Sequence, residues 1–219
     1  MTQRVEGVER AIEAFRRGEP VLIHDFDDRE AETDLVYPAA AVTPEAVARL
    51  RNDAGGLVCV ALSDAVADAF DLPLLEETID HPAAAGEVAY DDRSSFSLSV
   101  NHRETYTGIT DDDRSRTIRA LADAARQVPG YDLEDFAAEF RSPGHVTLLR
   151  AAPSLADRQG HTELGVELAA TADREPAVVV CEMLDDASGG ALPKAAAREY
   201  AARHDLAFVE GAALVEALS

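Results

Sequence analysis

The chain has 219 residues, of which 47% are hydrophobic, so it can bury a substantial core in one large domain or two small ones. Its 42 acidic and 20 basic residues give a formal net charge of −22, which disfavours nucleic acid as a partner because phosphate binding needs a basic face. Two cysteines exclude a disulfide framework or a cysteine-rich zinc site, and no apolar run reaches the roughly 18 residues of a membrane span. We expect a soluble, cytoplasmic protein with a single domain over residues 1–219.

The first half of the chain alternates between helical and strand patterns. Apolar residues on one face predict a helix at 5–17, which Gly18 stops. Thr43 followed by Pro44 is an N-cap before a first helical position. The further predicted elements are strands at 21–23 and 35–37, a helix from Pro44 to near Gly55, a strand at 57–62, a short helix after Ser63 and a long, mobile surface loop at 76–95.

The second half continues this mixture. Residues 96–101 alternate apolar and polar side chains as a half-buried strand does, and residues 110–113 match a capping box before a helix at 114–126. The remaining predictions are strands at 146–149 and 177–181 and helices at about 162–172, 194–204 and 211–218. Because strands and helices mix along the whole length, we expect an α/β (α+β) sandwich, a single compact domain with a mixed sheet flanked by helices.

The densest polar segment is residues 25–34, with six carboxylates and one guanidinium between two predicted strands. One interpretation is a solvated acidic loop, because charge runs usually lie on a surface. The other is a magnesium site, because Mg²⁺ prefers carboxylate oxygens, with water and substrate oxygens completing its shell. Arg29 adds a planar guanidinium suited to a phosphate or a carboxylate. The functional interpretation is therefore a metal ion together with a phosphorylated substrate.

Two histidine motifs follow. In residues 158–163 a glycine precedes His161 and a helical pattern follows it, so His161 could bind a metal ion and the helix start could bind an anion. The alternative is a structural histidine, which is the commoner role beside a helix. In residues 141–146 we expect a turn that delivers His145 to the start of a strand.

Glu182 ends the apolar run at 177–181, so it is expected at the end of a buried strand. Burial there would raise the pKa of its carboxyl toward the range useful for proton transfer. The alternative is a buried glutamate whose hydrogen bonds are satisfied and which has no catalytic role. Each of these motifs is a weak signal when it is taken singly.

Together and in this order, the motifs resemble the 3,4-dihydroxy-2-butanone 4-phosphate synthase family along nearly the whole chain. The segments similar to the family's motifs are residues 28–34, 107–110, 141–145, 158–163 and 181–182. Residues 53–57, 94–97 and 101–103 are most similar to archaeal members, which also carry a long insertion around residues 76–93.

The resemblance implies roles for individual side chains. Glu30 matches a carboxylate that binds both of two magnesium ions, and His161 matches a ligand of one of them; manganese could substitute. His145 and Glu182 match the two residues regarded as essential for catalysis. Positions that match substrate-binding residues are Arg29, Glu30, Asp34, Arg158, Gln159, Gly160, His161, Thr162 and Glu182.

The resemblance also implies a reaction and a partner. The family's enzymes, which are lyases of riboflavin biosynthesis, convert ribulose 5-phosphate into a four-carbon precursor and formate, and they form homodimers with active sites near the interface. Two alternatives stay open at this point. One is another magnesium-dependent lyase or isomerase acting on a sugar phosphate, and the other is a non-catalytic regulatory module that binds a metal or an anion.

The charge balance points to an environment. Lys194 is the only lysine, and the net charge of −22 makes the folded chain repel itself. Because dissolved salt screens such repulsion, we expect a halophilic protein from a high-salt cytoplasm. The alternative is an acidic protein from a cytoplasm of ordinary salinity.

Overall fold

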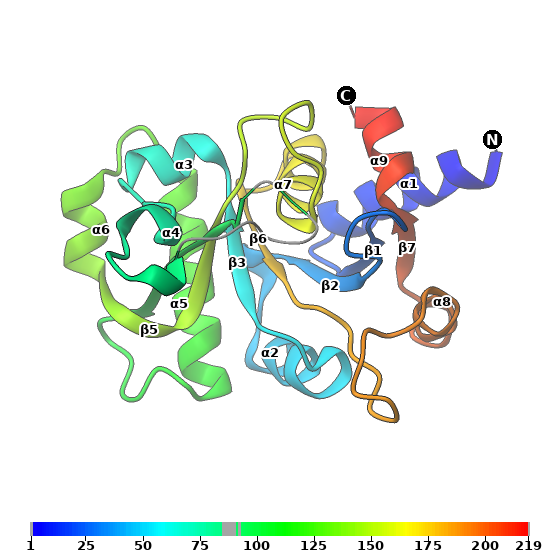
Figure 1. Ribbon diagram of the computed structural model, residues 1–219, viewed down its shortest axis with the longest axis horizontal. Helices are drawn as coiled ribbons and strands as arrows, with labels where there is room; N and C mark the ends of the chain where they lie inside the picture. The colour runs from blue at the N-terminus through cyan, green and yellow to red at the C-terminus, as the bar shows by residue number, and fades with distance from the viewer. Residues whose placement is uncertain (1, 85–90, 92, 219) are drawn as a thin grey trace.

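The computed structural model describes residues 2–84, 91 and 93–218, and within them seven strands form one mixed sheet (Figure 1). The strands are β1 (Val21–His24), β2 (Thr33–Pro38), β3 (Cys59–Leu62), β4 (Phe96–His102), β5 (Phe140–Arg150), β6 (Ala177–Val180) and β7 (Ala207–Glu210). Their order is β4-β5-β3-β6-β2-β1-β7. The β1–β7 and β3–β5 pairs are parallel, and the other pairs are antiparallel.

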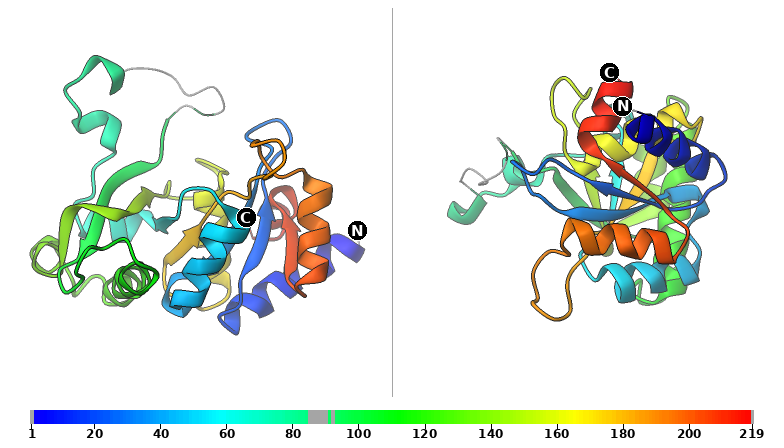
Figure 2. Two further views of the ribbon diagram at one scale, coloured as in Figure 1. Left: turned by 90° about the horizontal axis from the view of Figure 1, so that it is seen from below. Right: turned by 90° about the vertical axis from the view of Figure 1, so that its right-hand side faces the viewer.

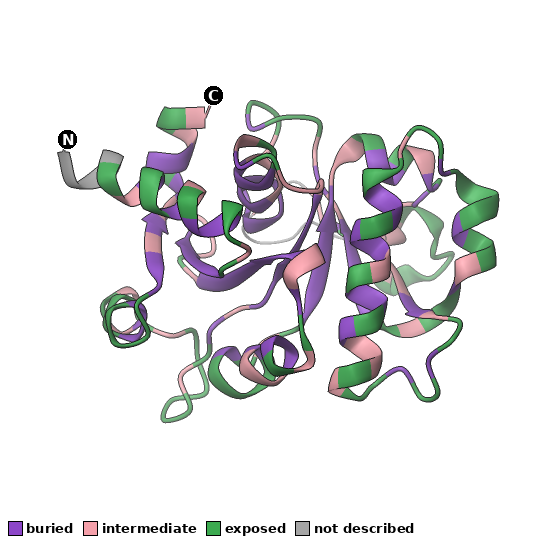
Figure 3. Ribbon diagram, turned by 180° about the vertical axis from the view of Figure 1, so that it is seen from behind, coloured by how far each residue is buried: buried purple, intermediate pink, exposed green. Residues whose placement is uncertain are grey.

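Helices cover both faces of the sheet (Figure 2). On one face lie α1 (Thr2–Arg16), α7 (His161–Thr171) and α9 (Gly211–Leu218), and on the other α2 (Pro44–Arg49), α3 (Asp64–Ala69), α5 (Asp111–Arg126), α6 (Leu133–Glu139) and α8 (Lys194–Arg203). Because both faces are covered, β1, β2, β3 and β6 are buried along their whole length (Figure 3). The expected sandwich is confirmed. No helix in the described ranges is both long and apolar enough to cross a bilayer.

The N-caps of two helices form where the sequence predicts them. The hydroxyl of Thr43 accepts the N–H of Ala46 at 3.2 Å and caps α2. A π-helical turn, Leu50–Ala54, extends this helix to Gly55, whose φ of 88° lets the chain reverse. The hydroxyl of Thr110 likewise caps α5.

The elements α6 and β7 have no counterpart among the predicted ones. Asp132 caps α6 by accepting the N–H groups of Glu134 and Asp135 at 2.9 and 3.2 Å, a signal that was visible in the sequence. β7 has only four residues, alternates buried and half-buried side chains and lies at the sheet edge against β1. So short a pattern is not distinguishable from a loop.

The predicted turn at residues 141–146 is wrong, because this segment lies inside β5. Asn101 of β4 pairs with the second residue of β5, whereas the neighbouring Val100 pairs with Val146. The intervening residues, of which His145 is the last, therefore bulge from the ladder. A bulge disturbs the alternation of side chains, so only the regular part of the strand is visible as a pattern.

The acidic segment and the long loop at 76–95 also differ from expectation. β2 begins at Thr33, so Asp34 lies inside a buried strand and not in the loop before it. The expected loop at 76–95 contains the end of α4 (Leu75–Thr78) and the 3-10 turn Pro82–Ala84. The mobility expected of the loop at 76–95 stays a prediction, and residues 85–90 and 92 of this loop lie outside the described residues.

Lys194 joins α8 to the loop after β1. Its Nζ lies 3.4 Å from Asp27 Oδ1 and 3.4 Å from Glu210 Oε2. The pair with Asp27 lies at the surface, because the Asp27 side chain is 79% exposed, whereas the side chains of Lys194 and Glu210 are 30% and 27% exposed. Exposed pairs of this kind contribute little to stability.

Candidate active site

The loop between β1 and β2 is folded around the carboxylate of Asp25. Its Oδ1 accepts the backbone N–H of Glu32 at 3.1 Å, and its Oδ2 accepts the backbone N–H of Glu30 at 3.3 Å and a guanidinium N–H of Arg29 at 3.2 Å. The side chain is fully buried, so these charge-assisted bonds offset its desolvation. Asp25 thereby fixes the direction in which Arg29 and Glu30 project.

A buried carboxylate in the first turn holds the N-terminus of α7. Glu163 accepts the N–H of Gly160 at 3.1 Å, the N–H of Ala152 at 2.9 Å and a guanidinium N–H of Arg158 at 2.6 Å. A Cβ at Gly160 would lie 2.7 Å from Arg158 Nη1 and 2.8 Å from Arg29 Nη2, so glycine lets both guanidinium groups approach the helix start. We call Arg29, Arg158 and the first turn of α7 the two-arginine site. Its charges and helix N-terminus suit an anion.

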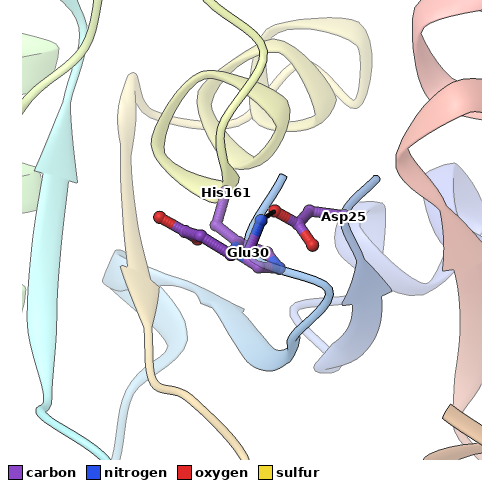
Figure 4. Close-up of side chains that lie close together, drawn as sticks. All are labelled: Asp25, Glu30 and His161. Carbon is purple, nitrogen blue, oxygen red and sulfur yellow. Dashed lines mark hydrogen bonds and ion pairs between the residues drawn. The ribbon is translucent and has the colours of Figure 1, made fainter. Parts of the chain in front are cut away.

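His161, the first residue of α7, points toward the loop after β1 (Figure 4). Its Nε2 lies 3.2 Å from the carbonyl oxygen of Ile23, which can only accept, so Nε2 donates. Its Nδ1 lies 3.3 Å from Glu30 Oε2 and 3.6 Å from Asp34 Oδ1. A ring held in this way directs Nδ1 toward the carboxylates, as a metal-binding histidine requires.

The pKa values of these buried groups reflect their mutual charges. Burial opposes protonation of His161, but the negative charges of Asp34, Glu30 and Asp25 outweigh it and raise the pKa of the ring to about 9. Burial raises the pKa of Asp34 to about 7. Burial also disfavours the ionised form of Glu30, but the hydrogen bond and charge of His161 and the nearby arginines lower its pKa. Without a metal ion, His161 is thus protonated at neutral pH and supplies the positive charge that a divalent cation would bring.

The side chains around His161 fit a metal ion. Ligand atoms of Asp25, Glu30 and His161 all lie within 4.8 Å of one another (Figure 4). Asp34 Oδ1 is buried beside them and has no hydrogen-bond partner among the described residues. Carboxylate oxygens with one imidazole nitrogen suit Mg²⁺ or Mn²⁺. A candidate metal site therefore exists in this chain.

Asp25 was not among the predicted site residues. It already accepts three N–H groups, so its carboxylate supports the site more than it offers a ligand atom. Its place directly after a buried strand was the signal that could have identified it.

Glu182 follows β6 and lies beside Asp34, with which it forms an isolated bridge. Its Oε2 accepts the N–H of Leu57 at 2.8 Å. A Cβ at Gly56 would collide with the Glu182 carboxylate and backbone, so glycine allows this close approach. The cavity here has about 90 Å³ and is lined by Glu30, Asp34, Cys59, Ser94, Ser95, Phe96, Leu149, Arg158, His161, Thr162, Val180 and Glu182.

Most of the predicted site residues gather at this cavity. Those that line it are Glu30, Asp34, Arg158, His161, Thr162 and Glu182, and Arg29 and Gly160 border it in the two-arginine site. Gln159 turns away, because its amide donates to the carbonyl oxygen of Leu155 at 3.0 Å. His145 is exposed on β5, where its Nδ1 lies 3.2 Å from the amide nitrogen of Asn101, and it does not line the cavity.

Known proteins are similar to this chain in sequence and in fold. The family model of 3,4-dihydroxy-2-butanone 4-phosphate synthase matches residues 9–217. The chain belongs to this family. A synthase from Archaeoglobus fulgidus is 48% identical over 219 residues, covering 95% of this chain and 92% of the relative, and one from Methanosarcina mazei is 46% identical over 224 residues, covering 97% and 91%.

Solved structures of the synthase family agree. A synthase in complex with two magnesium ions has a TM-score of 0.80 at 31% identity and covers 95% of this chain and 94% of its own. The Candida albicans synthase has a TM-score of 0.78 at 32% identity and covers 97% of each chain. Membership of the synthase family confirms the resemblance, its archaeal character and the expected class of enzyme, a lyase.

Proposed function

We propose that this chain converts D-ribulose 5-phosphate into L-3,4-dihydroxy-2-butanone 4-phosphate and formate. The observation that carries the proposal is one small cavity in which the groups that fit a divalent cation lie next to two arginines and a helix N-terminus that fit a phosphate. A phosphorylated sugar presents both kinds of group, hydroxyl and carbonyl oxygens at one end and a phosphate at the other.

Glu30 and His161 are the proposed ligands of two magnesium ions, for which manganese could substitute. Such ions act as Lewis acids that stabilise negative charge on vicinal substrate oxygens. The carbonyl of Ile23 keeps Nδ1 of His161 directed at the site. Asp34, whose buried Oδ1 has no hydrogen-bond partner among the described residues, is placed to bind a substrate hydroxyl.

The remaining side chains bind the substrate phosphate or transfer protons. Arg29 and Arg158 hold the phosphate, and Thr162 adds a hydroxyl in the first turn of α7. The N–H of Leu57 fixes Oε2 of Glu182, so we assign proton transfer to its other oxygen.

His145 is the second proposed acid–base residue, although it is exposed outside the cavity of its own chain. A catalytic role therefore requires His145 to act on substrate that is bound in the cavity of a neighbouring molecule. We propose a homodimer with active sites near the interface, in which the bulge of β5 meets the second copy. Asn101 prepares the ring for this role, because its Oδ1 accepts the backbone N–H of His145 at 2.8 Å and its amide nitrogen faces Nδ1.

The test is an assay of the purified protein with ribulose 5-phosphate and Mg²⁺ at molar KCl. Formate is measured by coupled oxidation, and the four-carbon product by mass spectrometry. We expect formate and product in equal amounts, and neither in the presence of a chelator. A rearranged sugar phosphate without formate would instead identify another lyase or isomerase, and metal binding without turnover would identify a regulatory module.

A further inference from the structure

The carboxylate of Asp91 lies between the two arginines of the two-arginine site. Its Oδ2 is 2.7 Å from Arg158 Nε and also accepts a hydrogen bond from Arg29 Nη2. The three side chains are nearly buried, with exposed fractions of 14% for Asp91, 10% for Arg158 and 12% for Arg29. Asp91 belongs to the segment between α4 and β4, and therefore to neither of the elements that build the site. An anion from elsewhere in the chain thus occupies the place that suits a phosphate.

The Asp91 carboxylate does not satisfy the hydrogen-bonding capacity of Arg158. Arg158 Nε is buried and has no hydrogen-bond partner in the described part of the chain, although Asp91 Oδ2 is only 2.7 Å away. Its N–H therefore does not point at that oxygen. A phosphate carries several tetrahedrally arranged oxygens, so it can accept from Nε, from Arg29 and from the first turn of α7 together. The site matches a larger anion than the one that it holds.

Charge gives a second reason to expect that another anion replaces the Asp91 carboxylate. Arg29 also pairs with two carboxylates of its own loop, and Arg158 pairs with Glu163 of α7. With Asp91 included, four carboxylates of the described residues lie against the two guanidinium groups. A phosphate dianion added beside all four would be repelled by each of them, and this repulsion is weakly screened in a nearly buried site. Phosphate binding is favoured if one carboxylate leaves.

We propose that Asp91 occupies the position of the substrate phosphate and is displaced when that phosphate binds. This inference rests on the proposed function, which assigns the phosphate to the two-arginine site. Asp91 thereby sets the selectivity of the site. Inorganic phosphate, which gains only the arginine contacts, must break those of Asp91 and binds weakly, whereas a substrate that also contacts the metal site binds well.

The test is a calorimetric titration of inorganic phosphate into the full chain at fixed pH and KCl concentration. Asp91→Asn removes the charge at nearly constant size, and Asp91→Ala also removes the amide that can still contact the arginines. We expect both variants to bind phosphate at least roughly fivefold more tightly, the scale of one ion pair. Asp80→Asn is the matched control, because Asp80 is an exposed acid of the same segment, and it should stay within about twofold of wild type.

Phosphate affinity that is unchanged or weaker in both Asp91 variants, at thermal midpoints near that of wild type, would overturn the proposal and show that Asp91 holds the arginines in place. The substrate assay separates this result from the proposed function. Asp91→Asn should lower KM for ribulose 5-phosphate with a smaller change in kcat. If the wild-type chain does not turn over ribulose 5-phosphate, the proposed function fails, while the phosphate titration still decides the role of Asp91.

Discussion

The orientation of one imidazole ring decides how the candidate metal site titrates. The carbonyl of Ile23 engages Nε2 of His161, so the proton that binds between the ring and the carboxylates is the one on Nδ1. That proton is held up to a pH of about 9 because of the surrounding negative charge. A divalent cation that coordinates Nδ1 must displace it.

Magnesium affinity should therefore rise with pH between 7.5 and 8.5, by roughly tenfold for one proton released. The sign follows from competition, because raising the pH removes the proton that occupies Nδ1. Calorimetry in two buffers of different ionisation enthalpy counts the protons released. A pH-independent affinity with no proton release would show that His161 does not bind the metal ion.

His161→Ala and Glu30→Gln should abolish magnesium binding and turnover together, with partial rescue at best by excess Mg²⁺.

Glu182→Gln should give the opposite pattern. The amide keeps an oxygen that can accept the N–H of Leu57, so the cavity should stay intact and bind magnesium as in wild type. Turnover should fall by at least about a hundredfold, the usual scale for the loss of a general acid or base. Magnesium titration and formate production are measured on the same preparation. Parallel loss of metal and activity would place Glu182 among the metal ligands.

At the scale of elements, the approach of β6 to the start of β3 depends on a glycine. The backbone N–H of Gly56 donates to the carbonyl of Glu182 at 3.0 Å, while the next N–H donates to the carboxylate of the same residue. Any side chain at position 56 must push these two segments apart. The position of the Glu182 carboxylate is thus set by the spacing of these two segments.

Gly56→Ala should lower stability by about 1–3 kcal/mol, the usual cost of overpacking, and lower kcat because Glu182 is displaced. Gly190→Ala is the matched control, because its nearest contact would be a serine oxygen at 3.6 Å in an exposed turn. Denaturant unfolding and formate assays compare the two variants. Wild-type activity in Gly56→Ala would show that the segment adjusts without moving the carboxylate.

Elements with strong local patterns were predictable from the sequence, and so were the residues that they carry. The buried strands β1 and β6 and the start of α7 have clear apolar or capping signals, which placed His161 at the start of a helix, Glu182 just after a strand and Glu30 in the loop that follows β1. The features that escaped prediction depend on contacts distant in sequence. The bulge that carries His145 is defined by β4, and the contact of Asp91 with Arg158 joins segments that have no common pattern.

At the scale of the whole molecule, the net charge of −22 opposes compaction and the proposed association into a dimer. Many carboxylates lie on the surface, and few basic side chains are available to pair with them. At 0.1 M salt the Debye length is about 10 Å, comparable to the spacing of neighbouring surface charges, and at 1 M it is about 3 Å. Most of the repulsion is therefore removed by molar salt.

The thermal midpoint and the sedimentation mass should consequently rise as KCl increases from about 0.1 M to 2 M. Saturating Mg²⁺ is held constant in these measurements, so that site binding is not mistaken for screening. A midpoint that stays flat or falls, with an unchanged oligomer, would contradict the halophilic interpretation and leave the enzymatic proposal untouched.

The position of Lys194 gives the molecule a practical chemical property. The chain has a single ε-amino group, that of Lys194. It lies beside Asp27, which belongs to the same loop as Glu30. Among the side chains, amine-directed reagents will therefore modify Lys194 alone, without any engineered residue. Because the ion pairs of this amine are worth little, acylation should leave the fold intact. A fluorophore introduced there would follow the loop of the candidate metal site in the otherwise unaltered protein.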